Sequence, residues 1–210
     1  MNSATQSLTL AGGAGPIEAL LDLPSAAPRG TAVIAHPHPL FGGTMHNKVV
    51  QTLARAFVQT GWRVLRFNFR GVGASAGVHD EGRGEAQDML ALVQQEAPEG
   101  PLALAGFSFG AFVTSQALAA LAPRLPEKLV LVGTAASRFA VAPIAPELHE
   151  RTLVLHGERD DTVPLASVMD WARPQLLPVT VVPGGEHFFH GQLPLLKSLV
   201  LRHLATPLTP

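Results

Sequence analysis

The sequence of 210 residues contains no cysteine. This absence excludes disulfide bonds, thiolate metal ligands and a cysteine nucleophile. Charged residues make up only 15% of the chain, and the formal net charge is −1, without a stripe of basic residues. We therefore expect neither nucleic acid nor an anionic membrane surface as a partner. Residues 1–5 lack a basic segment followed by an apolar one, which predicts no signal peptide and a cytoplasmic location.

One uncharged stretch, residues 100–123, is long enough to cross a bilayer. Hydroxyl and amide side chains and glycines interrupt it, and it divides into a strand followed by a helix. We therefore interpret this stretch as part of a globular core. Because the chain is 47% hydrophobic and shows no linker, repeat or low-complexity segment, residues 1–210 are expected to form a single domain.

Strand and helix patterns alternate along the chain after an opening hairpin. This alternation predicts an α/β fold with a mostly parallel central sheet and helices on both faces. Such sheets bind ligands at the carboxyl ends of their strands. The longest connection, residues 133–151, is too short for a folded cap domain. We expect the hairpin at residues 7–10 and 17–23, strands at 31–35, 62–69, 101–105, 128–132, 152–156 and 179–182, and helices at 48–60, 85–96, 111–121, 165–171 and 192–205.

Residues 106–110, with the sequence Gly-Phe-Ser-Phe-Gly, separate a short apolar run from an alanine-rich segment typical of a helix. In a sharp strand-to-helix turn the central residue adopts a strained backbone conformation, and its neighbours two positions away must be nearly free of side chain. Gly106 and Gly110 meet that requirement. The turn would raise the Ser108 hydroxyl above the edge of the sheet, at a helix N-terminus that favours developing negative charge.

A serine hydroxyl is a weak nucleophile and needs a neutral imidazole to take its proton. A carboxylate on the other ring nitrogen then orients and stabilises the imidazolium. The loops after the next two strands supply Asp160 and His187, so the chain order is serine, aspartate, histidine, as in the α/β-hydrolase fold. Three neighbours remain alternatives, which are Asp161 and Glu158 for the acid and His190 for the base.

Acyl transfer also needs two backbone N–H groups directed at the developing oxyanion. Phe109, directly after the serine, is expected to supply one of them. The loop after the first parallel strand is expected to supply the other, and because Pro37 and Pro39 have no N–H, the candidates are His38 and Leu40. We favour His38.

Four segments together resemble the signature of a compact bacterial group of lidless α/β-hydrolases, which are similar to dienelactone hydrolases but use serine as the nucleophile. The segments are residues 36–45 (HPHPLFGGTM), 66–75 (RFNFRGVGAS), 106–110 (GFSFG) and 187–191 (HFFHG). The resemblance covers residues 31–191. It implies an α/β-hydrolase fold without a cap domain and a triad at Ser108, Asp160 and His187. A dienelactone hydrolase is expected to have cysteine at position 108, so serine there argues against that activity.

The sequence favours neither of two cofactor hypotheses. The glycine-rich residues 71–77 follow a strand but depart from the dinucleotide-binding spacing, and no acidic residue stands at the required distance. His36 and His38, together with His187 and His190, are an alternative metal site, but the prolines alternating with the first two favour a structural turn. We therefore expect no cofactor and no metal.

The sequence predicts a serine esterase that cleaves carboxylic esters of small to medium acyl groups through an acyl-enzyme. A thioesterase, a lactone hydrolase and a non-catalytic binding protein remain alternatives. The expected partner is a small-molecule acyl ester, and both a monomer and a homodimer remain open. The candidates for substrate contact are Leu40, Phe41, Phe107 and Phe188 within an apolar pocket, with Arg70 and Arg138 for an acidic end of the substrate.

Overall fold

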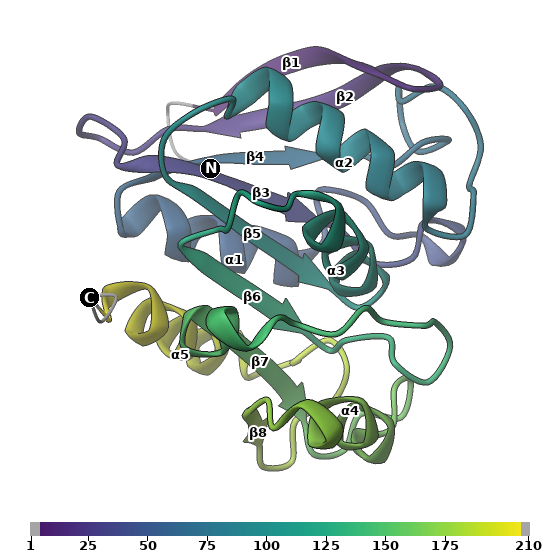
Figure 1. Ribbon diagram of the computed structural model, residues 1–210, viewed down its shortest axis with the longest axis vertical. Coiled ribbons are helices and arrows are strands. Elements are labelled where there is room, and N and C mark those ends of the chain that lie inside the picture. The colour runs from purple at the N-terminus through teal and green to yellow at the C-terminus, as the bar shows by residue number, and fades with distance from the viewer. Residues whose placement is uncertain (1–4, 207–210) are drawn as a thin grey trace.

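The computed structural model describes residues 5–206 and is built on one eight-stranded sheet (Figure 1). The expectation of no signal peptide rests mainly on residues 1–4, which lie outside the described residues. The strands are β1 (Thr5–Gly12), β2 (Gly15–Asp22), β3 (Gly30–Ala35), β4 (Trp62–Phe67), β5 (Leu102–Phe107), β6 (Lys128–Val132), β7 (Thr152–Gly157) and β8 (Val179–Val182). The α-helices are α1 (Lys48–Gln59), α2 (Arg83–Glu96), α3 (Phe109–Ala120), α4 (Leu165–Ala172) and α5 (Leu193–Ala205), and the short 3-10 helices are η1 (Pro39–Phe41), η2 (Pro146–Arg151) and η3 (Arg173–Gln175).

The strands lie in the order β1-β2-β4-β3-β5-β6-β7-β8. Strands β1, β2 and β4 pair antiparallel, and every later pair is parallel. The predicted mostly parallel α/β sheet is therefore confirmed. The connection from β6 to β7 contains only η2, so within the described residues no cap covers the carboxyl ends of the strands.

Helices cover both faces of the sheet, because its buried strands are apolar on both sides. Val33 and Leu65 point to the face covered by α2, α3 and α4. Ile34 and Val64, one position along, point to the face covered by α1 and α5. Figure 1 shows α2 and α3 on the near side of the sheet and α1 on the far side. The sheet is thus the middle layer of three.

Among the element boundaries that differ from the expected ones, two differ because of a hydrogen bond. Strand β4 ends at Phe67 rather than at residue 69, because Phe69 turns its N–H toward the Nε2 atom of His36, 2.9 Å away. Helix α2 begins at Arg83 rather than at residue 85, because the buried Glu85 carboxylate reaches back to accept the Gly82 N–H. In both cases a long-range or capping hydrogen bond overrides the local pattern.

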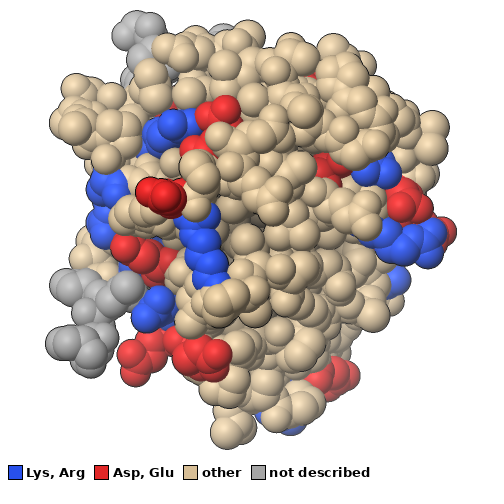
Figure 2. Space-filling view, turned by 45° about the horizontal axis from the view of Figure 1, so that its top comes forward, with Lys and Arg blue, Asp and Glu red and all other residues tan. Residues whose placement is uncertain are grey.

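The surface carries few charges, as the composition requires. On the face shown in Figure 2, basic and acidic side chains are interspersed, and wide areas have neither. Between residues 5 and 206, none of the helices has the length and apolar character that a bilayer-spanning segment needs.

Candidate active site

Ser108 lies at the turn between β5 and α3 with φ 57° and ψ −117°. A side chain in this positive-φ region is strained, which is the conformation the Gly-Phe-Ser-Phe-Gly sequence predicts. A Cβ atom on Gly106 would collide with the Gly110 carbonyl, and one on Gly110 would collide with the Ala35 carbonyl. The strand and the helix can therefore approach closely only because both positions are glycine. The Ser108 N–H donates to the Val132 carbonyl at 2.8 Å, which fixes the turn to β6.

A continuous series of hydrogen-bonding contacts joins Ser108, His187 and Asp160. His187 Nε2 lies 3.0 Å from Ser108 Oγ, and His187 Nδ1 lies 2.6 Å from Asp160 Oδ2. A carboxylate oxygen only accepts, so Nδ1 carries the proton and the Nε2 lone pair faces the serine hydroxyl. All three side chains are buried. The structure thus brings together three residues from three separate loops.

The turn after β7 orients the carboxylate. Asp160 Oδ1 accepts the N–H groups of Thr162 and Val163 at 3.0 and 2.7 Å, which leaves Oδ2 for the imidazole. Asp161 and Glu158, the alternatives for the acid, are both exposed. Glu158 accepts the Gly184 N–H instead.

The alternative histidine is occupied elsewhere. His190 is exposed and pairs with Glu186 on the same short segment. His187, by contrast, packs against two aromatic rings, and the Phe107 and Phe188 ring centroids each lie 5.0 Å from that of the imidazole.

Phe107 does not lie where a substrate-contact residue should. Its side chain has no exposed surface and packs among Val130, Val132 and other core residues under the His187 ring. The structure therefore corrects this candidate, because β5 directs Phe107 into the core rather than toward the open edge. Phe188 is 42% exposed and keeps a free face beside His187.

The two backbone amides predicted to form an oxyanion hole belong to Phe109, directly after Ser108, and to His38. Among the described residues, neither the Phe109 N–H nor the His38 N–H has a hydrogen-bond acceptor, and the two side-chain rings lie 4.8 Å apart. The alternative donor, the Leu40 N–H, donates to His38 Nδ1 at 3.3 Å. Leu40 and Phe41 are exposed at the tip of this loop.

His36 fixes the base of the same loop. Its Nε2 accepts the Phe69 N–H, so its Nδ1 carries the proton and donates to the Pro37 carbonyl at 2.6 Å. Burial lowers the pKa of His36 to about 4, although the bond to Pro37 opposes this shift. The imidazole is therefore a neutral structural support rather than a metal ligand.

Acid should destabilise the fold through the buried histidines. Burial also lowers the pKa of His203 to about 4. The unfolded chain therefore binds more protons than the folded one below pH 6.5, so stability present above pH 6.5 is lost as the pH falls toward 4. For His36 the loss is about 3 kcal/mol. We expect His36→Gln and His203→Gln each to flatten the pH dependence of the urea unfolding free energy between pH 7 and 4. Slopes equal to that of the unsubstituted protein would contradict this expectation.

A second histidine–carboxylate pair, missed from the sequence, lies beside residues 36–43, here named the oxyanion loop after the role predicted for His38. His79 Nδ1 is 2.9 Å from Oε1 of Glu85, whose side chain is completely buried. The His79 ring lies 4.9 Å from His38 and 5.3 Å from Phe109. The only sequence signal was a glutamate at the third position of a helix, which also fits simple capping. Glu85 both pairs with His79 and caps α2, since its Oε2 accepts the Gly82 N–H.

A cavity of about 920 Å³, here named the α2–α3 groove, opens beside the oxyanion loop. His38 lines it together with residues of α2 and α3 and with Phe112 and Phe139, whose ring centroids stack 4.7 Å apart. Phe41 and His79 also line it. Phe112 was not expected at the site, because inside a helix it could not be distinguished from a core residue.

The two arginines considered for substrate contact differ. Arg70 is bound to Asp88 at 2.9 Å and to the Gly84 carbonyl, so the structure corrects this candidate to a structural role. Arg138 lines the α2–α3 groove with its guanidinium 5.9 Å from the Phe41 ring centroid.

Burial lowers the pKa of His38, and the charges of His79 and Arg138 lower it further.

The glycine-rich loop folds back on itself. Gly71 N–H donates to the carbonyls of Ser75 and Ala76, and Ser75 Oγ donates to the Asn68 carbonyl.

Within residues 5–206, no three His, Cys, Asp or Glu side chains are grouped as a metal site would require.

Comparison with known proteins identifies the family. A family model described as serine aminopeptidase, S33, matches residues 26–149, a span that includes the oxyanion loop and Ser108 but ends before Asp160 and His187. The uncharacterized protein RP471 of Rickettsia prowazekii is 32% identical, over 83% of this chain and 78% of that protein.

Two solved structures are similar over almost their full length. XC6422 from Xanthomonas campestris, an α/β serine hydrolase without a lid, superposes with a TM-score of 0.87 at 38% identity, over 100% of this chain and 99% of that one. An α/β serine hydrolase homologue from Coxiella burnetii gives 0.81 at 34% identity, over 98% and 100%. This chain therefore belongs to the serine aminopeptidase S33 family, among the lidless α/β serine hydrolases.

Proposed function

We propose that this serine hydrolase cleaves carboxylic esters of small to medium acyl groups through an acyl-enzyme. The proposal rests on one observation. Hydrogen-bonding contacts run without a break from Ser108 Oγ through His187 to Asp160, with distances of 3.0 and 2.6 Å. The two amides of Phe109 and His38, which have no acceptor among the described residues, support it further.

In the first half of the reaction, Ser108 Oγ attacks the ester carbonyl carbon while its proton passes to His187 Nε2. The carbonyl oxygen becomes an oxyanion that accepts hydrogen bonds from the amides of Phe109 and His38. Asp160 stabilises the imidazolium through Nδ1. His187 then gives the proton to the departing alkoxide, the carbon–oxygen bond to the alcohol breaks, and an acyl group remains on Ser108.

In the second half, a water molecule replaces the alcohol. His187 takes a proton from the water, the hydroxide attacks the acyl carbon, and the same two amides hold the second oxyanion. The bond to Ser108 Oγ then breaks, and Oγ recovers its proton from the imidazolium. Carboxylic acid leaves and the enzyme returns to its initial state.

The groove geometry supports the choice of substrate size. His38 and the stacked Phe112 and Phe139 rings line the α2–α3 groove, which suits an apolar group of the substrate. Because this fold has no lid, a long acyl chain would extend from the groove into solvent. The gain in kcat/KM from each further methylene should therefore end where the groove opens to solvent.

A substrate panel tests the class of bond and the length of the acyl group. We expect p-nitrophenyl esters from acetyl to hexanoyl to be hydrolysed with kcat/KM rising with length, and dodecanoyl esters to bring no further gain. Matched thioesters and lactones are the comparison. Faster hydrolysis of a thioester or lactone than of the matched ester would move the assignment to those alternatives, and no turnover of any substrate would favour a non-catalytic binding protein.

A further inference from the structure

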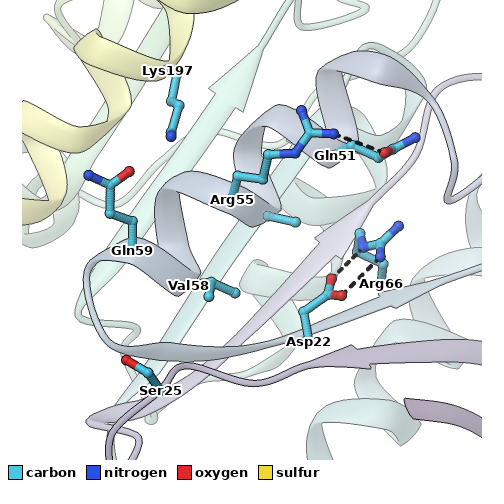
Figure 3. A pocket seen from close by; sticks show the side chains of 9 residues that line it. Asp22, Ser25, Gln51, Arg55, Val58, Gln59, Arg66 and Lys197 are labelled. Carbon is cyan, nitrogen blue, oxygen red and sulfur yellow. Dashed lines mark hydrogen bonds and ion pairs between the residues drawn. The ribbon is translucent and has the colours of Figure 1, made fainter. Parts of the chain in front are cut away.

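A second cavity, of about 570 Å³, lies beside α1 (Figure 3), and Ser108 is not among the residues that line it. Side chains of α1, Arg66 of β4 and Lys197 of α5 line it, together with Asp22 and Ser25 at the end of β2. None of these residues belongs to the hydrogen-bonded series at Ser108. Its volume falls within the usual range of about 300–1,000 Å³ for small-molecule sites.

Helix α1 presents a polar row to this cavity. Gln51, Arg55 and Gln59 are spaced four residues apart and therefore lie along one side of the helix. Arg55 Nη2 donates to Gln51 Oε1 at 3.3 Å, which orders the guanidinium without neutralising it. Among the described residues, no carboxylate lies within ion-pair distance of Arg55. The row thus offers a positive charge flanked by two amides.

The single carboxylate of the cavity is already neutralised. Asp22 accepts two hydrogen bonds from Arg66, from Nε at 2.7 Å and from Nη2 at 3.1 Å, and this pair is buried. Figure 3 shows the paired contacts beside α1. Arg66 Nη1 donates to the Met45 carbonyl at 3.0 Å, so the guanidinium is held rigidly.

Lys197 adds a second uncompensated charge. Its ammonium reaches from α5 toward α1 in Figure 3 and, within residues 5–206, has neither a hydrogen bond nor an ion pair. Arg173, by comparison, is paired with Asp170. The cavity therefore combines two unpaired cations, and the neighbouring amides and the Ser25 hydroxyl add hydrogen-bonding groups.

We propose that this cavity is a binding site for a small molecule with at least two negative charges, carried by phosphate or carboxylate groups. Arg55 and Lys197 would pair with the charges, because guanidinium and ammonium groups are the usual partners of these anions. The two glutamines and Ser25 would hydrogen-bond the neutral polar part of the ligand. The site is independent of the proposed ester hydrolysis, since it shares no residue with it.

Calorimetric titration with inorganic phosphate, pyrophosphate and citrate at constant ionic strength tests this site. We expect one molecule of at least one anion to bind per chain, and the anion that binds most tightly identifies the preferred group. The double variant Arg55→Gln and Lys197→Gln should weaken that binding by about tenfold or more. The control Arg173→Gln and Arg202→Gln makes the same change in net charge elsewhere and should bind as the unsubstituted protein does.

The proposal is overturned if none of the three anions binds, or if both double variants lose affinity equally, because the effect would then be one of overall charge. Ester hydrolysis measured on the same samples separates the two assignments. The Arg55/Lys197 variant should retain its turnover, and a fall in turnover equal to that in anion affinity would place the anion at the active site instead.

Discussion

Replacing Ser108 by alanine should reduce kcat for p-nitrophenyl ester hydrolysis by on the order of 10⁴- to 10⁶-fold, equivalent to about 5–8 kcal/mol of transition-state stabilisation. The reason is that, among the described residues, only the Ser108 hydroxyl contacts His187 Nε2, at 3.0 Å. The fold should persist, because alanine retains the Cβ atom at this strained φ of 57° and loses only the Oγ atom. Release of p-nitrophenol by the purified variant, followed over time, measures kcat.

The thermal midpoint of Ser108→Ala provides the control. A variant that melts near the temperature of the unsubstituted protein and has lost its activity supports a chemical role for the hydroxyl. If the folded variant kept more than about a tenth of the activity, Ser108 would not be the nucleophile.

Replacing His187 by alanine should have an effect of similar size, since the proton of Ser108 would have no acceptor. His190→Ala is the matched control, because it removes the same side chain three positions along the same segment. His190 is exposed and its pair with Glu186 is a surface contact, which is worth little. We therefore expect kcat/KM of His190→Ala to stay within about threefold of the original value.

The opposite outcome would reassign the base. If His190→Ala abolished turnover while His187→Ala retained it, the loop would have to rearrange during catalysis to bring His190 to Ser108. Equal losses in both variants, with lowered thermal midpoints, would indicate damage to the loop rather than to the chemistry.

The fold was predictable from the sequence because its signals are local. Alternating apolar strands and helical segments give the parallel sheet, and Gly106 and Gly110 mark the turn at Ser108 because any side chain there would strike a backbone carbonyl. The placement of residues at the carboxyl edge follows from strand direction alone, which is why loops distant in sequence could be expected to meet.

The finer parts of the site depend on contacts that local patterns do not contain. Asp160 and Asp161 are adjacent and identical in type, and only the turn closed by the Val163 N–H onto Asp160 directs one inward and the other outward. Phe107 was expected near the substrate because of its place in the motif, but strand alternation sends it into the core. The pair of His79 and Glu85 joins a loop to a helix, and the spacing of the two residues in the sequence matches no known motif.

The arginines illustrate the same limit. Arg70 and Arg138 both stand in loops near the site in sequence, and nothing in their neighbours separates them. Asp88, eighteen positions after Arg70, occupies the first guanidinium and leaves only the second beside the α2–α3 groove. Which cations are already paired is a property of the folded chain.

Labelling with a fluorophosphonate probe, followed by peptide mapping, tests most directly whether the alcohol of Ser108 is an activated nucleophile. We predict one phosphonyl adduct per chain on the peptide that contains Ser108, no adduct in Ser108→Ala, and strongly slowed labelling in His187→Ala. A folded protein that remains unlabelled, or one labelled at another serine, would contradict the account.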